Sequence, residues 1–183
     1  MKTIINPPKK TWSQILKRPT QTVEDIENTV NQIFQDIQQT GDFAVSKYTS
    51  MFDGVELDDI LVSEYEITEA EEKISEDLKT AIQNAKRNIE TFHLAQKTSK
   101  IEVETTQGVL CWQEKKPIEK IGLYIPGGTA PLFSTVLMLA APAQIVGCKE
   151  IVLCSPPSKE GKIANEILYA AKLCGCTKII KVG

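Results

Sequence analysis

The chain has 183 residues, of which 42% are hydrophobic and 25% are charged, and its formal charge is −3. This composition is typical of a globular protein and excludes a disordered, collagen-like or coiled-coil chain. The charge leaves no basic excess for nucleic-acid binding, and the longest apolar run, Val136 to Ala143, is far shorter than the roughly 20 residues that cross a bilayer. We therefore expect no nucleic-acid or membrane partner and a cytoplasmic location, since no signal peptide opens the sequence.

The cysteines are predicted to be reduced. There are five, an odd number, and they lie in apolar surroundings where a thiol behaves as a small hydrophobe. A zinc or iron–sulfur cluster is disfavoured because no CxxC pair occurs and the only histidine, His93, is distant in sequence.

Helical periodicity dominates the sequence to about Lys100. Thr11 and Gln14 are spaced as a capping pair, which predicts a short helix that stops before Pro19. A second helix is expected from Thr22 to the glycine at 41, with one apolar stripe that should pack against another element. That stripe consists of Val23, Ile26, Val30, Ile33, Phe34 and Ile37.

A third helix is predicted to begin at Asp42 and to break at 52–54. Thr68 and Glu71 form a capping-box pattern that predicts the longest helix, from Thr68 to Lys97. A β-hairpin is then expected, because residues 101–105 alternate in polarity before a Gln-Gly turn and a second, less regular strand over 109–114.

From Ile118 onward, apolar strands alternate with helices. Strands are predicted at 121–125 and 150–154 and in the run 177–183, with helices over 132–147 and 162–173 between them. This order indicates a parallel sheet with both faces covered and right-handed crossovers. The expected fold class is therefore α/β: a helical N-terminal segment with a β-hairpin, then a βαβαβ unit like an incomplete Rossmann fold.

The loop from Pro126 to Pro131 is the candidate site, because ligands of parallel α/β sheets gather where strands lead into helices. Gly127 and Gly128 allow close approach of the backbone, and the helix start suits a phosphate or carboxylate. From the residues alone, ligand binding and a simple chain reversal remain equally open. Tyr124, at the tip of the preceding strand, is either a ligand contact or a core tyrosine.

An ordinary dinucleotide fingerprint is absent. It requires GxGxxG after the first strand and an acidic residue at the end of the second, whereas the second strand here runs into Ser155-Pro156-Pro157. His93 on its long helix is interpreted as a structural hydrogen-bonding group, and Pro142 is expected to kink or restart its helix.

Residues 122–138, GLYIPGGTAPLFSTVLM, closely resemble the glycine-rich segment of histidinol dehydrogenases. Segments 88–93, 148–157 and 166–171 resemble the same family, so the similarity extends over essentially the whole chain. The resemblance implies oxidation of L-histidinol to L-histidine with two NAD per product, a bound zinc, and a homodimer.

The resemblance also assigns residues. Tyr124, Pro126, Gly127 and Gly128 match the family's NAD-contacting region, and Thr129 is a weaker candidate beside the substrate. The family's zinc ligands and catalytic Glu-His pair are expected outside these 183 residues, so no catalytic and no metal residue is assigned here.

The resemblance further implies that this is the N-terminal part of a longer enzyme, inactive by itself. Residues 1–119 would be the helical part of the catalytic domain, and residues 120–183 the first half of an atypical Rossmann-like NAD-binding domain. The alternative hypothesis is a non-catalytic α/β module derived from that family, which binds a nucleotide or dimerises.

Overall fold

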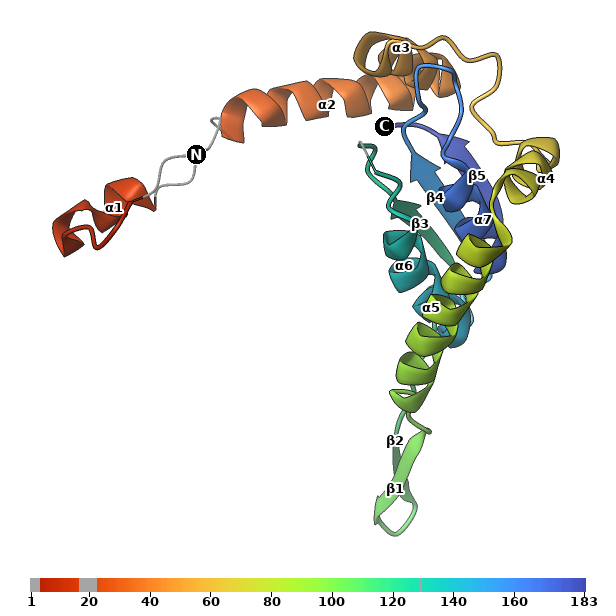
Figure 1. The fold of residues 1–183 in the computed structure, drawn as a ribbon. Helices are drawn as coiled ribbons and strands as arrows, with labels where there is room; N and C mark the ends of the chain where they lie inside the picture. Colours follow the sequence, from red (N-terminus) through yellow and green to blue (C-terminus); the bar gives the residue numbers. More distant parts are fainter. Residues whose placement is uncertain (1–3, 17–22, 129) are drawn as a thin grey trace. The chain divides into compact units, whose positions relative to one another are not determined.

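The structure, a computed structural model, describes residues 4–16, 23–128 and 130–183. The chain forms two compact units, Met1–Ala44 and Val45–Gly183. Figure 1 shows the elements in chain order. The candidate site lies entirely in the second unit.

The first unit contains a short 3-10 helix, η1 (Lys9–Thr11), then α1 (Trp12–Ile15) and α2 (Val23–Thr40). The predicted capping role of Thr11 is wrong: its hydroxyl donates to the Pro8 carbonyl, 2.8 Å away, and caps no helical N–H group. Pro19 and Thr22 lie outside the described residues.

Helix α2 ends as predicted at Gly41, whose φ of +57° is a left-handed conformation that favours glycine. Of its predicted apolar stripe, Ile26, Val30, Phe34 and Ile37 are exposed and Ile33 is half-buried, while the side chain of Val23 is not described. Helix α3 (Asp42–Asp53) starts at the predicted residue and ends before Gly54.

The helix predicted over Thr68–Lys97 is in fact two helices, α4 (Glu64–Lys73) and α5 (Glu76–Ala95). The capping box is formed by Ser63 and Glu66, not by Thr68, whose hydroxyl instead donates to the Glu64 carbonyl. Between the helices Ile74 is extended, which buries its side chain and lets Ser75 cap α5. Tertiary burial of one isoleucine therefore breaks a continuous helical pattern.

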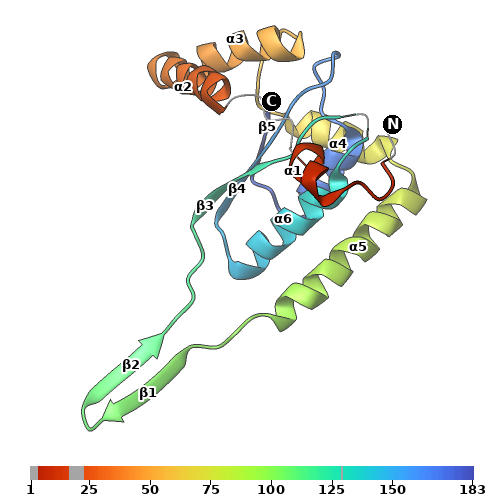
Figure 2. The ribbon, with the colours of Figure 1, turned by 90° about the vertical axis from the view of Figure 1, so that its left-hand side faces the viewer.

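The predicted hairpin is confirmed, with β1 (Ile101–Thr106) antiparallel to β2 (Val109–Gln113) and Gly108 at φ +81° in the turn. Both faces of this hairpin are exposed, including Trp112 at 64%. Figures 1 and 2 both show it extending from the end of α5, away from the parallel sheet.

The predicted βαβαβ unit is confirmed. Its strands β3 (Lys120–Tyr124), β4 (Glu150–Ser155) and β5 (Lys178–Lys181) form a parallel sheet in the order β3-β4-β5. Tyr124 pairs with Cys154, and Cys154 pairs with Ile180, so the carboxyl ends of the three strands are aligned. The two crossovers contain α6 (Phe133–Val146) and α7 (Asn165–Leu173).

The expectation that both faces of this sheet are covered is wrong for the described residues. Ile121, Leu123 and Ile125 alternate with more exposed neighbours, and the same pattern continues in β4 and β5. Helix α6 packs against α5 and α7, and α7 packs against α4; buried side chains of these helices form one core with Leu123, Ile151, Leu153 and Ile179 of the strands. Consecutive right-handed crossovers that advance in one direction place their helices on the same side, which explains the one-sided cover.

The core lies between this face and the helices. Its largest fully buried side chains are Ile82, Ile125, Leu137, Leu153, Val136, Cys174 and Ser155. The edge of β5 is paired as well, because the Val62 N–H donates to the Ile179 carbonyl and the Lys181 N–H donates to the Ile60 carbonyl.

Helix α6 is the most apolar element. It has 14 residues and continues through Pro142, so the predicted restart does not occur, and it ends before Gly147 at φ +93°. None of the helices within the described ranges is both long enough and apolar enough to cross a bilayer. All five cysteines are free thiols.

Candidate functional site

The start of the loop between β3 and α6 is held in place by a backbone hydrogen bond to β4. The N–H of Ile125 donates to the Cys154 carbonyl at 2.8 Å, which extends the pairing of β3 with β4 by one residue. Ile125 itself is fully buried. The backbone therefore leaves the sheet at Pro126 in a defined direction, at the carboxyl edge where parallel sheets bind ligands.

Gly127 and Gly128 serve different purposes. A Cβ atom at position 127 would lie 2.6 Å from Cγ of Pro156, far inside van der Waals contact, whereas a Cβ at 128 would meet nothing within 4 Å. Only glycine at 127 lets this loop approach the loop that follows β4. Gly128 leaves open space, which gives a ligand access to the backbone.

A cavity of about 530 Å³ opens beside this loop, at the carboxyl edge of the sheet. It is lined by Asp53, Pro126, Gly127, Gly128, Ala130, Pro131, Ser155, Pro156, Pro157, Ser158, Lys162, Ala164, Glu166 and Ile167. The volume is within the range of pockets that bind small molecules and cofactors.

The N-termini of α6 and α7 both follow this cavity's loops in the chain. Their N-cap residues, Leu132 and Ala164, make no side-chain hydrogen bond to the first turn. The first N–H groups of both helices are therefore left without a side-chain cap, and the helix dipole adds partial positive charge. Both features favour an anionic ligand group such as a phosphate.

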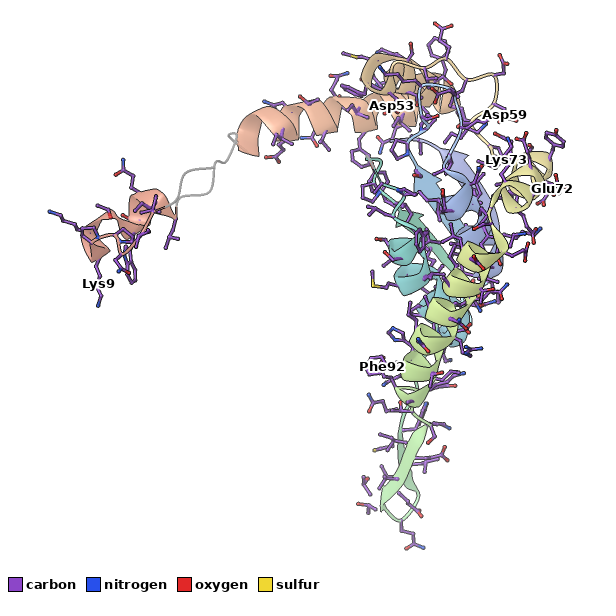
Figure 3. All side chains as sticks on the ribbon, viewed as in Figure 1. Lys9, Asp53, Asp59, Glu72, Lys73 and Phe92 are labelled. Carbon is purple, nitrogen blue, oxygen red and sulfur yellow. The ribbon has the colours of Figure 1, made fainter. Side chains whose placement is uncertain are left out.

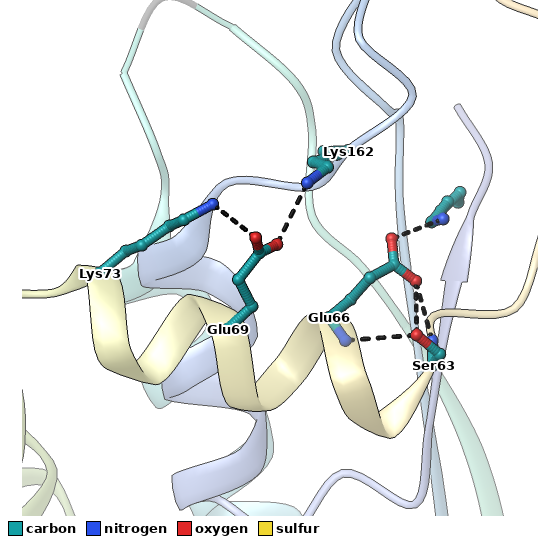
Figure 4. Close-up of polar contacts among 6 residues, drawn as sticks. Ser63, Glu66, Glu69, Lys73 and Lys162 are labelled. Atoms are coloured by element: carbon teal, nitrogen blue, oxygen red, sulfur yellow. Dashed lines mark hydrogen bonds and ion pairs between the residues drawn. The ribbon is translucent and has the colours of Figure 1, made fainter.

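The cation on the cavity wall is already paired. Lys162 Nζ donates to Glu69 Oε2 at 3.1 Å, and Lys73 approaches the other oxygen of the same carboxylate (Figure 4). Hydrogen bonds from Lys73 and Lys162 hold the pKa of Glu69 below its usual value. Lys162 thus ties the loop before α7 to α4, so its charge is not fully available to a ligand.

Three of the predicted residues, Pro126, Gly127 and Gly128, are brought together on the cavity wall. Tyr124 is next to them in the chain, but its side chain is 53% exposed and alternates away from buried Leu123. Thr129 lies outside the described residues.

Sequence reasoning missed Asp53, which reaches the cavity from the end of α3. No local signal identifies it, because Phe52-Asp53-Gly54 is an ordinary helix ending. Burial raises the pKa of its carboxyl above the usual value. Asp53 can be associated with the glycine loop only once the chain is folded.

His93 lies elsewhere, near the end of α5. Its Nδ1 is 3.0 Å from Oε1 of Gln96, and it lines a separate cavity with Lys115 and Pro142. This placement agrees with the structural role predicted for it. Within the described residues, no group of three or more His, Cys, Asp or Glu side chains is arranged to hold a metal ion.

Comparison with known proteins gives a consistent result. A family model described as histidinol dehydrogenase matches residues 16–183. The histidinol dehydrogenase of Bacteroides fragilis (strain ATCC 25285) is 54% identical over 183 residues, which is all of this chain and 43% of the relative. That of Escherichia coli (strain K12) is 51% identical over 171 residues, 93% of this chain and 38% of the relative.

A solved structure is also similar. The crystal structure of histidinol dehydrogenase from Elizabethkingia anophelis superposes with a TM-score of 0.89 at 52% sequence identity, covering 100% of this chain and 42% of that one. The chain therefore spans about two fifths of the length of the relatives that it matches.

Proposed function

This chain belongs to the histidinol dehydrogenase family, and from that premise we propose that it forms part of an oxidoreductase that converts L-histidinol to L-histidine with NAD in histidine biosynthesis. Within it, residues 120–183 would be the first half of an atypical Rossmann-like NAD-binding domain, and residues 1–119 the helical part of the catalytic domain. We also propose a cytoplasmic homodimer, as the family resemblance implies.

The observation that carries the NAD assignment is the contact between Gly127 and Pro156. It packs two loops together at the carboxyl edge of β3 and β4, and an open cavity of about 530 Å³ lies beside them. To bind a dinucleotide, the loop backbone must come close to the diphosphate, and a helix N-terminus must attract the negative charge of the diphosphate. Gly128 and the uncapped first turn of α6 meet both needs.

The proposed roles follow from these positions. Pro126 directs the loop, Gly127 allows the two loops to pack, and Gly128 leaves the backbone accessible to the diphosphate. Tyr124 offers an exposed ring for stacking and a hydroxyl for hydrogen bonding at the edge of the site. When bound, NAD accepts hydride from the substrate.

The described residues do not fit a zinc site, because they contain no cluster of three potential ligands. We propose accordingly that this chain binds NAD but does not by itself oxidise L-histidinol. The alternative is a non-catalytic nucleotide-binding or dimerisation module, which would also bind NAD. The two hypotheses differ in one prediction: a longer form of the protein oxidises L-histidinol under the first and has no activity under the second.

Calorimetric titration of the chain with NAD tests the proposal. We expect saturable binding, and we expect Tyr124→Ala to weaken it by about tenfold, which is typical for the loss of an aromatic contact of 1–1.5 kcal/mol. Tyr65→Ala is the matched control: neither tyrosine lines the cavity and both are exposed, but Tyr124 lies two residues before Pro126 on the cavity wall, whereas Tyr65 lies on α4.

Absence of NAD binding to the wild-type chain would contradict the proposed cofactor site. Equal weakening by both tyrosine substitutions would instead assign the effect to general surface changes. Oxidation of L-histidinol by the chain with NAD and zinc would show that catalytic residues are present within it.

A further inference from the structure

The carboxylate of Asp53 stands against the ends of two strands of the parallel sheet. A Cβ atom at position 183 would lie 3.1 Å from both Asp53 carboxylate oxygens and 3.1 Å from Cβ of Pro156. Gly183 follows β5 and Pro156 follows β4, so the absence of a side chain at 183 makes room for this carboxylate. Figure 3 labels Asp53 at the end of α3, near the ends of the strands.

This carboxylate has no protein partner among the residues that the structure describes: none of them donates a hydrogen bond to it or pairs with it as a cation. The lysine on the cavity wall, Lys162, is bonded to Glu69 instead. A partly buried carboxylate without partners is unfavourable in an empty site, and burial correspondingly raises its pKa. A ligand that supplies hydrogen-bond donors would remove that cost.

Asp53 occupies the place of an acidic residue that dinucleotide-binding units carry and that is absent from the end of β4. In dinucleotide-binding βαβ units, an acidic residue at the end of the second strand accepts hydrogen bonds from the ribose hydroxyls. Here the second strand, β4, ends in Ser155 and continues into Pro156 and Pro157. Asp53 brings a carboxylate to that place from a different element.

We propose that Asp53 accepts hydrogen bonds from the vicinal ribose hydroxyls of NAD bound in this cavity and thereby selects NAD over NADP. The inference rests on the proposed function, since it requires NAD in the site. A ribose diol offers two donors to the two carboxylate oxygens, and charge-assisted hydrogen bonds of this kind are stronger than neutral ones. The 2′-phosphate of NADP offers no such donors and is repelled by the negative charge.

The test compares calorimetric titrations of the chain with NAD and with NADP, in a buffer that contains a chelator. We expect the wild-type chain to bind NAD at least tenfold more tightly than NADP. Asp53→Asn should weaken NAD binding by about tenfold and nearly abolish the preference over NADP. Asp58→Asn is the matched control, because Asp58 is an exposed aspartate of the following loop that does not line this cavity.

Thermal unfolding of the same variants separates binding from structure. Asp53→Asn removes an unpartnered, partly buried charge, so its Tm should equal or exceed that of the wild-type chain. A lower Tm together with lost binding would show a structural role and overturn the inference. Unchanged NAD affinity in Asp53→Asn would overturn the inference alone, whereas no binding to the wild-type chain would overturn the proposed function as well.

Discussion

Lys181, the last residue of β5, forms an ion pair with Glu66 in the first turn of α4, with 2.7 Å between Nζ and Oε1. Both side chains are largely buried, with exposed fractions of 10% and 21%. The other oxygen of Glu66 accepts hydrogen bonds from the N–H and hydroxyl of Ser63 (Figure 4). One carboxylate thus closes the capping box of α4 and fastens that helix to the sheet.

Replacement of this carboxylate should destabilise the fold in a pH-dependent way. Burial alone would raise the pKa of Glu66, but hydrogen bonds from Lys181 and Ser63 outweigh it and hold the pKa below the usual 4.5. A lowered pKa in the folded state stabilises it above pH 4.5, and this contribution disappears as the pH falls through the folded-state pKa.

We therefore expect Glu66→Gln to cost about 1–3 kcal/mol of unfolding free energy at pH 7, since Lys181 loses its counter-charge. The difference from wild type should shrink toward pH 3, roughly the range in which paired carboxylates become protonated. Urea unfolding across pH measures it. Glu72→Gln, on the exposed side of α4, serves as control, and an equal effect there would refute a specific role for the pair.

The contact between Gly127 and Pro156 predicts a difference between adjacent glycines. Gly127→Ala places a methyl group 2.6 Å from the proline ring, so the loop must move away from Pro156. Because the displaced loop no longer fits the ligand, the NAD affinity measured by calorimetry should fall by roughly tenfold or more, which is a loss of at least about 1.4 kcal/mol of binding free energy. Gly127→Ala should also lower the Tm of the chain, whereas Gly128→Ala should leave the Tm unchanged, because nothing lies within 4 Å of its added methyl group in the absence of a ligand. Equal Tm values of the two variants would contradict the proposed loop packing.

Replacement of an isoleucine by alanine should lower the free energy of unfolding much more in the core than in the hairpin. Ile82 of α5 is fully buried, and its replacement by alanine should cost about 2–4 kcal/mol in urea unfolding. Ile101 of β1 is exposed, so Ile101→Ala should cost less than about 0.5 kcal/mol. A large effect at Ile101 would mean that the hairpin packs against another surface in solution.

Thiol reactivity offers a check on the packing of α7. Burial raises the pKa of Cys174 to about 11 and that of Cys176 to about 12, so at pH 8 roughly one Cys174 thiol in a thousand is ionised. Cys111 on the hairpin is exposed. With a disulfide reagent, Cys111→Ser should remove the fastest phase, whereas Cys174→Ser and Cys176→Ser should leave it unchanged. Fast labelling of Cys174 in the native chain would contradict the buried position.

By itself, the sequence determined the order of the elements and most of the elements themselves, although it predicted α4 and α5 as one helix. Periodicity and glycines at chain turns predicted the hairpin, the three parallel strands and the helices between them, because these signals depend on neighbours within a few residues. The glycine-rich run 122–138 identified the family, and it located the loop that forms one wall of the cavity.

Only the tertiary structure decided which local signals are used and which distant residues meet. Thr68 and Ser63 offer similar caps, but burial of Ile74 selects two helices, the first capped by Ser63. Both crossover helices lie on one face because the strands are added in one direction. Asp53 reaches the cavity because α3 ends beside Gly183 and Pro156. Such long-range contacts depend on how the elements pack together, and local periodicity carries no information about that packing.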